Sequence, residues 1–379
     1  MTDDELVRHN EEVRRIKAAY ARGAPERVPV RFAINARMLL LDPAFNRGRW
    51  TARRVLDDPR VNWELLLEYQ RWARFEVPQD EEMGLPEQWS MDVCLWNIYE
   101  AGWFGCEIWF PEDDVPDTKP MFAERKERLY ETPLPDPLRG NLMGRVMEHR
   151  EALDAMRKKE DFLGRPVAKP GLPSGTDGPV TVACNLRGAT ELCGDLMEDE
   201  KYFHDLLAWI TDGIIARVSA ANAETGAQGR AWVADDSISL LSARQYRDHV
   251  LPHHRRLLDA FAPHRPHAMH LCGKVQHLLP LIAAELDIRS FELGYPTDLG
   301  QARAELGPAV ELIGNIAPML LRSGPPALLE AAVKNACEGG AMRGGRFILM
   351  DGNNVAPGTP LAHFAAMYEA GKRWWRYRP

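Results

Sequence analysis

The hydrophobic pattern of the chain consists of short apolar runs that alternate with longer amphipathic segments. Eight runs are rich in Val, Ile, Leu and Phe and predict buried strands. They cover residues 28–34, 106–110, 180–184, 231–234, 268–271, 288–293, 310–314 and 346–350. Amphipathic helical patterns follow the third and later runs, over residues 202–223, 243–262, 275–286, 298–306, 325–338 and 360–375. This alternation indicates strands joined by right-handed parallel crossovers.

Eight strands that are apolar on both faces favour a closed (β/α)₈ TIM barrel over an open doubly wound sheet. The open sheet is the alternative, but no glycine-rich dinucleotide fingerprint follows the first run to support it. Residues 35–104 and 111–178 are too long for single crossovers. We interpret them as helical and loop insertions after the first and second strands that cover the mouth of the barrel. The sequence thus predicts one domain over residues 1–379.

The composition narrows the functional classes. The 379 residues carry a net charge of −8, with a sequence pI of about 5.8, which argues against nucleic acid or an anionic membrane surface as a partner. No apolar run is long enough to span a membrane, and the charged N-terminal stretch MTDDELVRHNEEVRR is unlike a secretory signal. The six cysteines are scattered, which suits a reducing compartment. We therefore expect a cytoplasmic protein.

Polar side chains follow most of the apolar runs, and in a barrel the active site gathers at the carboxyl ends of the strands. From these positions come the candidate catalytic residues Arg37, Asp235, Asp236, Glu292 and Asn353, and the candidate substrate-binding residues Asn185, Asn315 and Asp351. An Asp or Asn at such a position can instead cap the following helix or form a turn. The alternative is weakest for Asp235 and Asp236, because two carboxylates adjoin there.

The stretch HAMHLCG offers a metal-ligand pair. His270 and Cys272 are two residues apart, so in a strand their side chains lie on the same face. An imidazole beside a soft thiolate suits zinc, and Gly273 allows a ligand or the backbone to approach closely. Glu292 and Asp236, which end the next and the previous runs, are the candidates for a third ligand. The alternative is a satisfied histidine and an inert thiol at a strand end.

Three C-terminal stretches resemble the uroporphyrinogen decarboxylase superfamily. They are HLCGKVQHLLPLIAAELDIRSFEL, LGPAVELIGNIAP and GGRFILMDGNNVAPGTPLAHFAAMYEA. A fainter likeness in RVPVRFAINAR and GTDGPVTVACNLRGATELCGDLMEDEKYFHDLL extends over most of the chain. The order of HxCG, GN and a terminal GxxxxPxTP is specific for the superfamily. The resemblance implies a (β/α)₈ barrel with its site at the strand ends.

Two activities are implied by this resemblance. One branch removes the acetate carboxyl groups of uroporphyrinogen without a cofactor, using paired arginines after the first strand, an aspartate, a tyrosine and a late histidine. The other branch moves methyl groups between a corrinoid on a partner protein and a thiol or folate acceptor. Its thiol-using members bind zinc through a His-x-Cys pair and a late cysteine. The HLCG motif resembles the second branch.

The chain departs from both branches. FAINAR stands where the decarboxylases have RQAGR, so only Arg37 matches the paired arginines. Asn353 stands where one branch has histidine and the other cysteine. The aspartate of the decarboxylases corresponds to Asp92 or is replaced by Asn97, both of which are candidate substrate-binding residues.

We therefore predict a methyltransferase or demethylase of this superfamily, acting on a small molecule with a corrinoid partner protein. The metal ligands are then His270, Cys272 and a carboxylate such as Glu292. A uroporphyrinogen decarboxylase that needs no cofactor is the first alternative, and a barrel that only binds an aromatic or tetrapyrrole ligand is the second. The oligomeric state is left open, a homodimer included.

Overall fold

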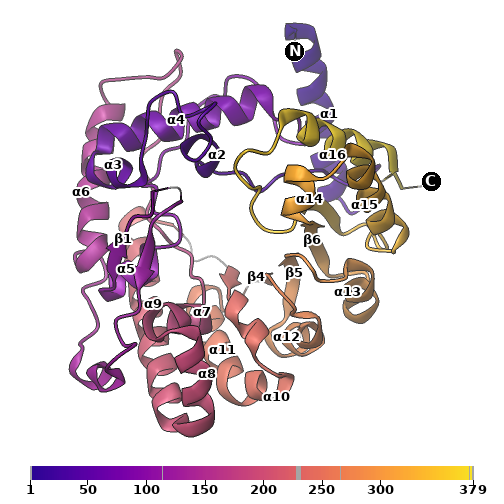
Figure 1. Ribbon diagram of the computed structural model, residues 1–379. Coiled ribbons are helices and arrows are strands. Elements are labelled where there is room, and N and C mark those ends of the chain that lie inside the picture. Colours follow the sequence, from indigo (N-terminus) through magenta and orange to yellow (C-terminus); the bar gives the residue numbers. More distant parts are fainter. Residues whose placement is uncertain (1, 113, 228–231, 265, 375, 378–379) are drawn as a thin grey trace.

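The computed structural model describes residues 2–112, 114–227, 232–264, 266–374 and 376–377. Helices surround strands in the ribbon, and the N-terminal helix α1 (Asp3–Ala21) lies beside the C-terminal helix α16 (Leu361–Trp374) (Figure 1). An antiparallel bridge between Arg27 and Arg376 joins the two ends of the chain. None of the described helices is long and apolar enough to cross a membrane.

The central element is a five-stranded parallel sheet in which neighbours in sequence are neighbours in space. Its strands are β3 (Trp232–Ala234), β4 (His267–Leu271), β5 (Ile288–Leu293), β6 (Glu311–Ile316) and β7 (Phe347–Asp351). The crossovers contain α11 (Leu251–Phe261), α12 (Leu279–Leu286), α13 (Leu299–Leu306), α14 (Pro318–Ser323) and α15 (Pro326–Glu338). The predicted parallel α/β architecture is confirmed for this half of the chain.

Extended segments continue both edges of the sheet. Beside β7, the amide of Arg31 donates to the carbonyl of Leu349 at 2.9 Å, and Leu349 donates to the carbonyl of Pro29 at 2.9 Å. Beside β3, the amide of Ala234 donates to the carbonyl of Thr176 at 3.2 Å. An extended segment is therefore hydrogen-bonded to each edge strand of the sheet, although neither segment forms a full strand.

Helices make up most of the remaining chain. The N-terminal part contains α2 (Arg37–Leu40), α3 (Ala52–Asp57), α4 (Pro59–Glu76), α5 (Tyr99–Phe104), the 3₁₀ helix η1 (Lys126–Glu131) and α6 (Asn141–Arg157). The middle contains α7 (Pro179–Arg187), α8 (Ala189–Glu198) and α9 (Glu200–Thr225). Between β3 and α11 lie η2 (Asp236–Leu240), α10 (Ala243–Gln245) and a π-helical turn, η3 (Tyr246–Val250); η4 (Gln276–Leu278) precedes α12.

Three of the eight predicted strands are wrong or incomplete. Residues 28–34 contribute only the bridge from Val30 to Leu349. Residues 106–110 contain a strand, β1 (Glu107–Trp109), but it pairs antiparallel with β2 (Asp117–Lys119) outside the parallel sheet. Residues 180–184 are helical. The last five runs match β3 to β7 within a few residues; residue 231 of one run and residue 375 of the last helical pattern lie outside the described residues.

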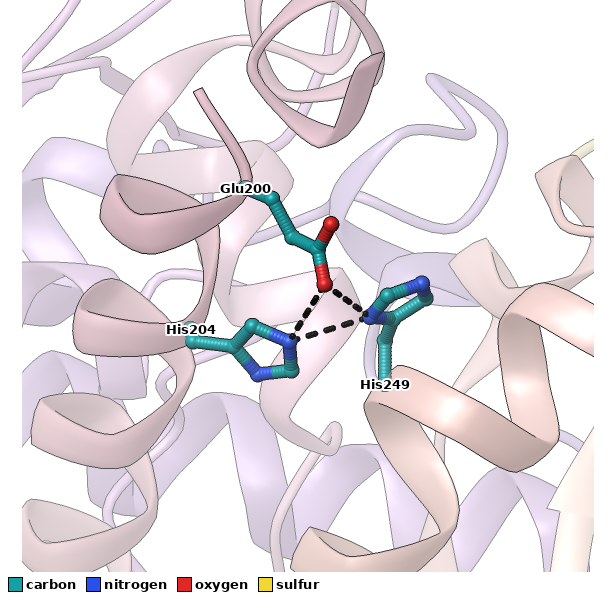
Figure 2. A group of neighbouring side chains, drawn as sticks. All are labelled: Glu200, His204 and His249. Atoms are coloured by element: carbon teal, nitrogen blue, oxygen red, sulfur yellow. Dashed lines mark hydrogen bonds and ion pairs between the residues drawn. The ribbon is translucent and has the colours of Figure 1, made fainter. Parts of the chain in front are cut away.

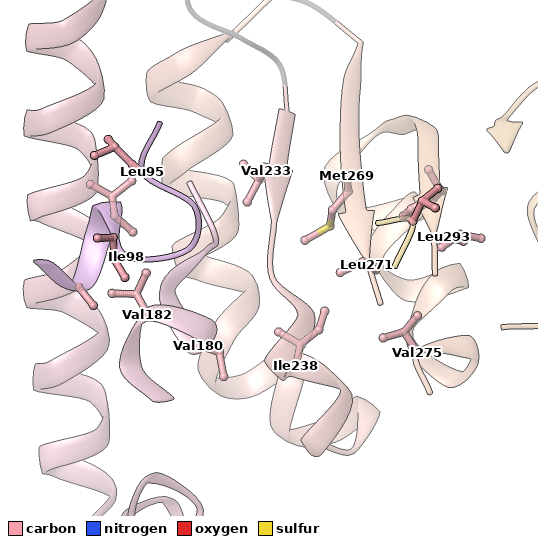
Figure 3. Close-up of a cluster of buried hydrophobic side chains, with 14 of the residues drawn as sticks. Leu95, Ile98, Val180, Val182, Val233, Ile238, Met269, Leu271, Val275 and Leu293 are labelled. Atoms are coloured by element: carbon pink, nitrogen blue, oxygen red, sulfur yellow. The ribbon is translucent and has the colours of Figure 1, made fainter. Parts of the chain in front are cut away.

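The error at residues 180–184 has a clear physical reason. The alternating valines suggested a strand, but the buried positions of α7 include Pro179, Val182, Ala183 and Leu186, which recur at helical spacing. Proline at the first turn suits a helix start. Figure 3 shows the α7 valines among buried side chains that include Ile98 of the loop before α5 and Val233 of β3. Helix α7 is thus fixed by the hydrophobic core on the side of β3.

Candidate active site at the strand ends

A cavity of about 420 Å³ lies where β3, β4 and β5 end. It is lined by Ala33, Arg37, Asn97, Asp117, Asp177, Thr181, Asn185, Trp232, Ala234, Asp236, His270, Glu292, Asn353 and Asn354. The strand register creates this meeting, because Ala234 lies opposite His270 and His270 lies opposite Glu292. A larger cavity of about 980 Å³ lies against α4, and none of the residues predicted for the site lines it.

His270 is the centre of the polar cluster. Its Nδ1 lies 2.9 Å from Oε1 of Glu292, while its Nε2 lies 3.2 Å from Sγ of Cys272 and 3.6 Å from Oδ1 of Asp236. The Asp236 oxygen also accepts a hydrogen bond from the Cys272 amide at 2.7 Å. Nδ1 of the imidazole ring therefore contacts Glu292, which orients the ring, and Nε2 contacts a thiol and a carboxylate.

The close contact between Cys272 and the next strand end requires a glycine. A Cβ at Gly294 would lie 2.4 Å from Sγ of Cys272 and 2.9 Å from its Cα, so no side chain fits there without moving the cysteine. Gly273 has a φ of +81°, in the left-handed region that favours glycine. These two glycines set the position of the thiol beside His270.

The protonation of this cluster follows from its burial and charge. Burial opposes a charged ring, but hydrogen bonds to Cys272 and Glu292 and the charge of Asp236 outweigh it and raise the pKa of His270 to about 11. Burial raises the pKa of the Cys272 thiol and of Asp236. The ring therefore holds a proton among acidic groups, at a point that a bound cation can take instead.

Three ligand atoms lie in the arrangement that a metal needs. Nε2 of His270, Sγ of Cys272 and a carboxylate oxygen of Asp236 all lie within 4.8 Å of one another. Glu292 contacts the opposite nitrogen of the ring, which is the place of a carboxylate that orients a metal-bound histidine. The donor set of one nitrogen, one sulfur and one oxygen fits zinc.

Asp235 does not line the cavity, although the sequence put it beside Asp236 as a catalytic candidate. Its side chain is fully buried and accepts hydrogen bonds from the amides of Val180 at 3.0 Å and Thr181 at 2.8 Å, from the Thr181 hydroxyl at 2.8 Å, and from Nε2 of His254 at 2.9 Å. It thus stabilises the start of α7, and this corrects the expectation that both carboxylates face the mouth of the site.

The side chains of Asp351 and Asn315 also form hydrogen bonds with the backbone of the protein. Oδ1 of the fully buried Asp351 accepts from the amide of Ala33 at 2.8 Å. The amide of Asn315 donates to the carbonyls of Gly294 at 3.1 Å and Thr297 at 2.6 Å, which fixes the turn after β5. Neither residue is among those that line the cavity, although the sequence predicts both as substrate-binding residues.

Arg37 and Asn97 lie together in the cavity wall. Nη2 of Arg37 donates to Oδ1 of Asn97 at 2.7 Å, and burial lowers the pKa of the guanidinium. Within the described ranges Arg37 forms no ion pair. Its positive charge therefore faces the cavity without a carboxylate partner. Asp92 instead lies at a neighbouring pocket, where Oδ1 accepts from the amide of Gly171 at 3.1 Å. Of the two alternatives for the inserted acidic position, the structure brings Asn97 into the cavity.

Asp177 was not predicted from the sequence. Burial, together with the charges of Glu100 and Asp236, raises its pKa to about 7. Its amide donates to Oε2 of Glu100 at 2.7 Å, and Glu100 forms a buried ion pair with Arg217 at 2.7 Å. The Asp-Gly-Pro sequence at residues 177–179 is a signal for the start of a helix that could have indicated this carboxylate. A strand over residues 180–184 would instead have Asn185 at its carboxyl end.

The remaining lining residues complete the wall. Asn185 and Asn353, which the sequence predicts as a substrate-binding and a catalytic residue, both line the cavity. Oδ1 of Asn353 accepts a hydrogen bond from the side-chain Nδ2 of Asn354 at 3.0 Å. The indole of Trp232 lies 6.2 Å from the ring of His270 and provides an apolar surface beside it. The site therefore combines four carboxylates, one guanidinium, amides and an aromatic wall.

The protein has an α/β fold, and its candidate active site lies at the carboxyl ends of parallel strands. The family model for uroporphyrinogen decarboxylase (URO-D) matches residues 93–374, well over half of the chain. The protein therefore belongs to the URO-D family.

Relatives within the family differ in activity. The chain is 28% identical to the methylated-thiol–coenzyme M methyltransferase of Methanosarcina mazei over 72% of its own length and 69% of that protein. It is 27% identical to a methylcobamide:CoM methyltransferase of Methanosarcina barkeri, over 79% of this chain and 83% of the relative. The uroporphyrinogen decarboxylase of Parasynechococcus marenigrum is 28% identical over 46% of this chain and 48% of its own length.

A solved structure supports the fold. A methyltransferase from Methanosarcina mazei superimposes with a TM-score of 0.65 at 19% sequence identity, covering 95% of this chain and 98% of that chain. The similarity therefore extends over most of the chain that precedes residue 93, where the family match begins.

Proposed function

We propose that the protein is a methyltransferase that moves a methyl group between a small methylated substrate or acceptor and a corrinoid carried by a partner protein. The observation that carries this proposal is the convergence of His270 Nε2, Cys272 Sγ and Asp236 Oδ1 at one wall of the cavity. Two relatives that are covered over 69% and 83% of their own lengths are named as methyltransferases, one for a methylated thiol and one for methylcobamide.

In this proposal His270, Cys272 and Asp236 hold a zinc ion, and Glu292 orients the ring of His270 through Nδ1. Asp236 is favoured over Glu292 as the third ligand because it lies on the Nε2 side of the ring, with Cys272. When bound, zinc stabilises a thiol acceptor as a thiolate near neutral pH.

Other residues of the chain have separate tasks. Arg37, fixed by Asn97, binds an anionic end of the substrate, since a guanidinium grips a carboxylate or sulfonate through two hydrogen bonds. Asp177, with a pKa of about 7, would take the proton that a thiol acceptor loses when it becomes a thiolate, before its sulfur accepts the methyl group. Trp232 excludes water beside the reacting atoms.

The cavity disfavours the alternative, a uroporphyrinogen decarboxylase. About 420 Å³ is near the lower end of the roughly 300–1,000 Å³ of small-molecule pockets. Four lining carboxylates, Asp117, Asp177, Asp236 and Glu292, face a single arginine. A tetrapyrrole that carries many carboxylates needs several cations around it, so this lining favours a small neutral, cationic or singly anionic substrate.

We further propose that the extended segments beside β3 and β7 belong to a closed (β/α)₈ barrel, with residues 1–379 as one domain. Support comes from the chain that continues both edges of the parallel sheet and from the likeness in fold over 95% of the chain. The acidic, cysteine-poor composition fits a cytoplasmic enzyme.

Methyl transfer from methylcobalamin to small thiols, followed by the change in the corrinoid absorption spectrum, tests the proposal. We expect wild-type protein to contain zinc by plasma emission, and Cys272→Ser to contain one zinc ion less per chain and to lose at least about 100-fold in rate. Cys193→Ser, on the outer helix α8, is the matched control and keeps both.

Two outcomes contradict the proposal. Full activity of a Cys272→Ser protein that has lost the zinc ion of this site removes the role of the metal. Formation of coproporphyrinogen from uroporphyrinogen at a rate exceeding methyl transfer establishes the decarboxylase instead.

A further inference from the structure

A second group of metal-ligating side chains lies away from the cavity, on the outer helices. It consists of Glu200 and His204 of α9 and His249 of the π-helical turn η3 (Figure 2). None of these residues lines the cavity of the candidate active site. The three side chains point toward one another in Figure 2, with two imidazole nitrogens and one carboxylate oxygen at the centre.

The local structure explains how these residues meet. Glu200 and His204 are four residues apart in the first turns of α9, so both side chains lie on the same face of the helix. His249 comes from a different element, in which the wider π-helical turn replaces the α-helical spacing. Single π turns of this kind are frequent at functional sites. Phe203 packs against both histidine rings, with centroids 6.1 Å from each.

The distances between the ligand atoms fit a tetrahedral ion. Nε2 of His204 lies 3.0 Å from Nδ1 of His249 and 3.5 Å from Oε1 of Glu200, and the His249 nitrogen lies 3.7 Å from the same oxygen. Ligands at about 2.0–2.1 Å in a tetrahedron are about 3.3 Å apart. The three distances between the ligand atoms lie on either side of this value. One point therefore lies about 2.0 Å from all three atoms.

The exposure of the three side chains leaves room for an open coordination position. The side chain of His249 is 16% exposed, that of His204 is 40% exposed and that of Glu200 is 64% exposed. An ion held between them thus has protein on one side and solvent on the other, where water supplies the fourth ligand. In the hydrogen-bonded pair, one of the two facing nitrogens must carry a proton, and binding only requires that this proton move to the outer nitrogen of its ring.

We propose that Glu200, His204 and His249 form a second divalent metal site, selective for a transition metal such as Zn²⁺. Two imidazoles and one carboxylate suit Zn²⁺ better than Ca²⁺ or Mg²⁺, which prefer sets of oxygen ligands. The ion joins the start of α9 to the turn that leads into α11. Helix α11 carries His254, which supports Asp235 at the end of β3, so the ion stabilises the outer layer behind the candidate active site.

The test uses full-length protein in which Cys272→Ser has removed the sulfur ligand of the other site. After treatment with a chelator, this protein is titrated with Zn²⁺ by calorimetry, and we expect one ion bound per chain. His249→Ala and Glu200→Gln in the same background weaken binding by at least about tenfold, the loss that even an outer ligand partner causes. His264→Ala, an exposed histidine before β4, is the matched control and leaves the affinity unchanged.

Cobalt distinguishes this site from the one at Cys272. In wild-type protein, Co²⁺ at Cys272 gives an intense sulfur-to-metal charge-transfer band, whereas Co²⁺ at Glu200, His204 and His249 gives only weak visible bands. Glu200→Gln removes the weak bands that Cys272→Ser retains, and Glu200 is exposed enough for this variant to fold. Absence of Zn²⁺ binding in Cys272→Ser, or equal affinity in His249→Ala and His264→Ala, overturns the proposal.

Discussion

Adjacent aspartates have opposite environments in this protein. Asp236 lines the cavity beside His270, whereas Asp235 is fully buried and accepts hydrogen bonds from α7 and His254. Successive side chains at a strand end point to opposite sides, so a pair of acids in the sequence does not make a pair in the site. Only one of the two carboxylates is therefore available for substrate or metal.

The buried carboxyl group of Asp351 makes the free energy of unfolding depend on pH. Burial raises its pKa from an ordinary value of 3.8 to about 7, so the folded state holds the proton more tightly than the unfolded state. The stabilisation is complete below about pH 4 and is lost as the pH rises through about 7. Asn at this position keeps an oxygen for the Ala33 amide but does not titrate.

We expect the free energy of unfolding of wild-type protein to fall, relative to Asp351→Asn, between about pH 4 and pH 7, by up to about 1.4 kcal/mol per pH unit. Urea denaturation of both proteins across this range measures the difference. Parallel pH profiles of the two proteins contradict the raised pKa.

At the scale of elements, the start of helix α7 depends on the side chain of Asp235, which directly follows strand β3. Its first amides donate to Asp235, and a Cβ at Gly178 would lie 2.2 Å from the carbonyl of Ala234. The helix start and the end of β3 are thus packed without space between them. This contact also positions Thr181 at the cavity wall.

Asp235→Ala removes the cap of α7 and leaves His254 buried without its carboxylate. We expect the free energy of unfolding to fall by about 3–5 kcal/mol, because breaking a buried charged network strands its partners. Asp298→Ala is the control: Asp298 is the N-cap residue of α13, it accepts from the amide of Gln301 at an exposed position, and its loss costs about 1 kcal/mol. Equal losses for the two variants in chemical denaturation show that burial does not matter at Asp235.

At the scale of the whole molecule, a buried ion pair in the N-terminal part accepts a hydrogen bond from the C-terminal helix α16. Arg27 donates to both carboxylate oxygens of Asp80 at 2.6 Å, and Asp80 also accepts from the amide of Val30 at 2.7 Å and the hydroxyl of Tyr368 at 3.2 Å. The side chains of Arg27 and Asp80 are 5% and 0% exposed. The pair holds the extended segment that lies beside β7.

Arg27→Ala leaves the Asp80 carboxylate buried without its cation. We expect a loss of about 3 kcal/mol or more in the free energy of unfolding, a large part of the roughly 5–15 kcal/mol of a typical domain. Lys119→Ala, which removes an exposed pair with Glu107, costs less than about 1 kcal/mol. Thermal unfolding of the two variants beside wild type measures the contrast, and a loss at Arg27 no larger than at Lys119 refutes it.

The sequence by itself determined the parallel half of the fold and the central pair of the site. The runs that form β3 to β7 contain short apolar stretches and alternate with amphipathic helices, and this alternation indicates the parallel sheet. His270 and Cys272 meet because they are two residues apart at the end of one strand, and the bond between His270 and Cys272 follows from that local geometry.

Only the tertiary structure decided which other groups join them. Glu292 meets Nδ1 of His270 because of the register between β4 and β5, and Asp177 reaches the cavity because residues 180–184 form a helix. Glu200 and His204 meet His249 through helix packing across more than forty residues. Local patterns fix periodicity and spacing along the chain, whereas register and packing depend on contacts between segments that are distant in sequence.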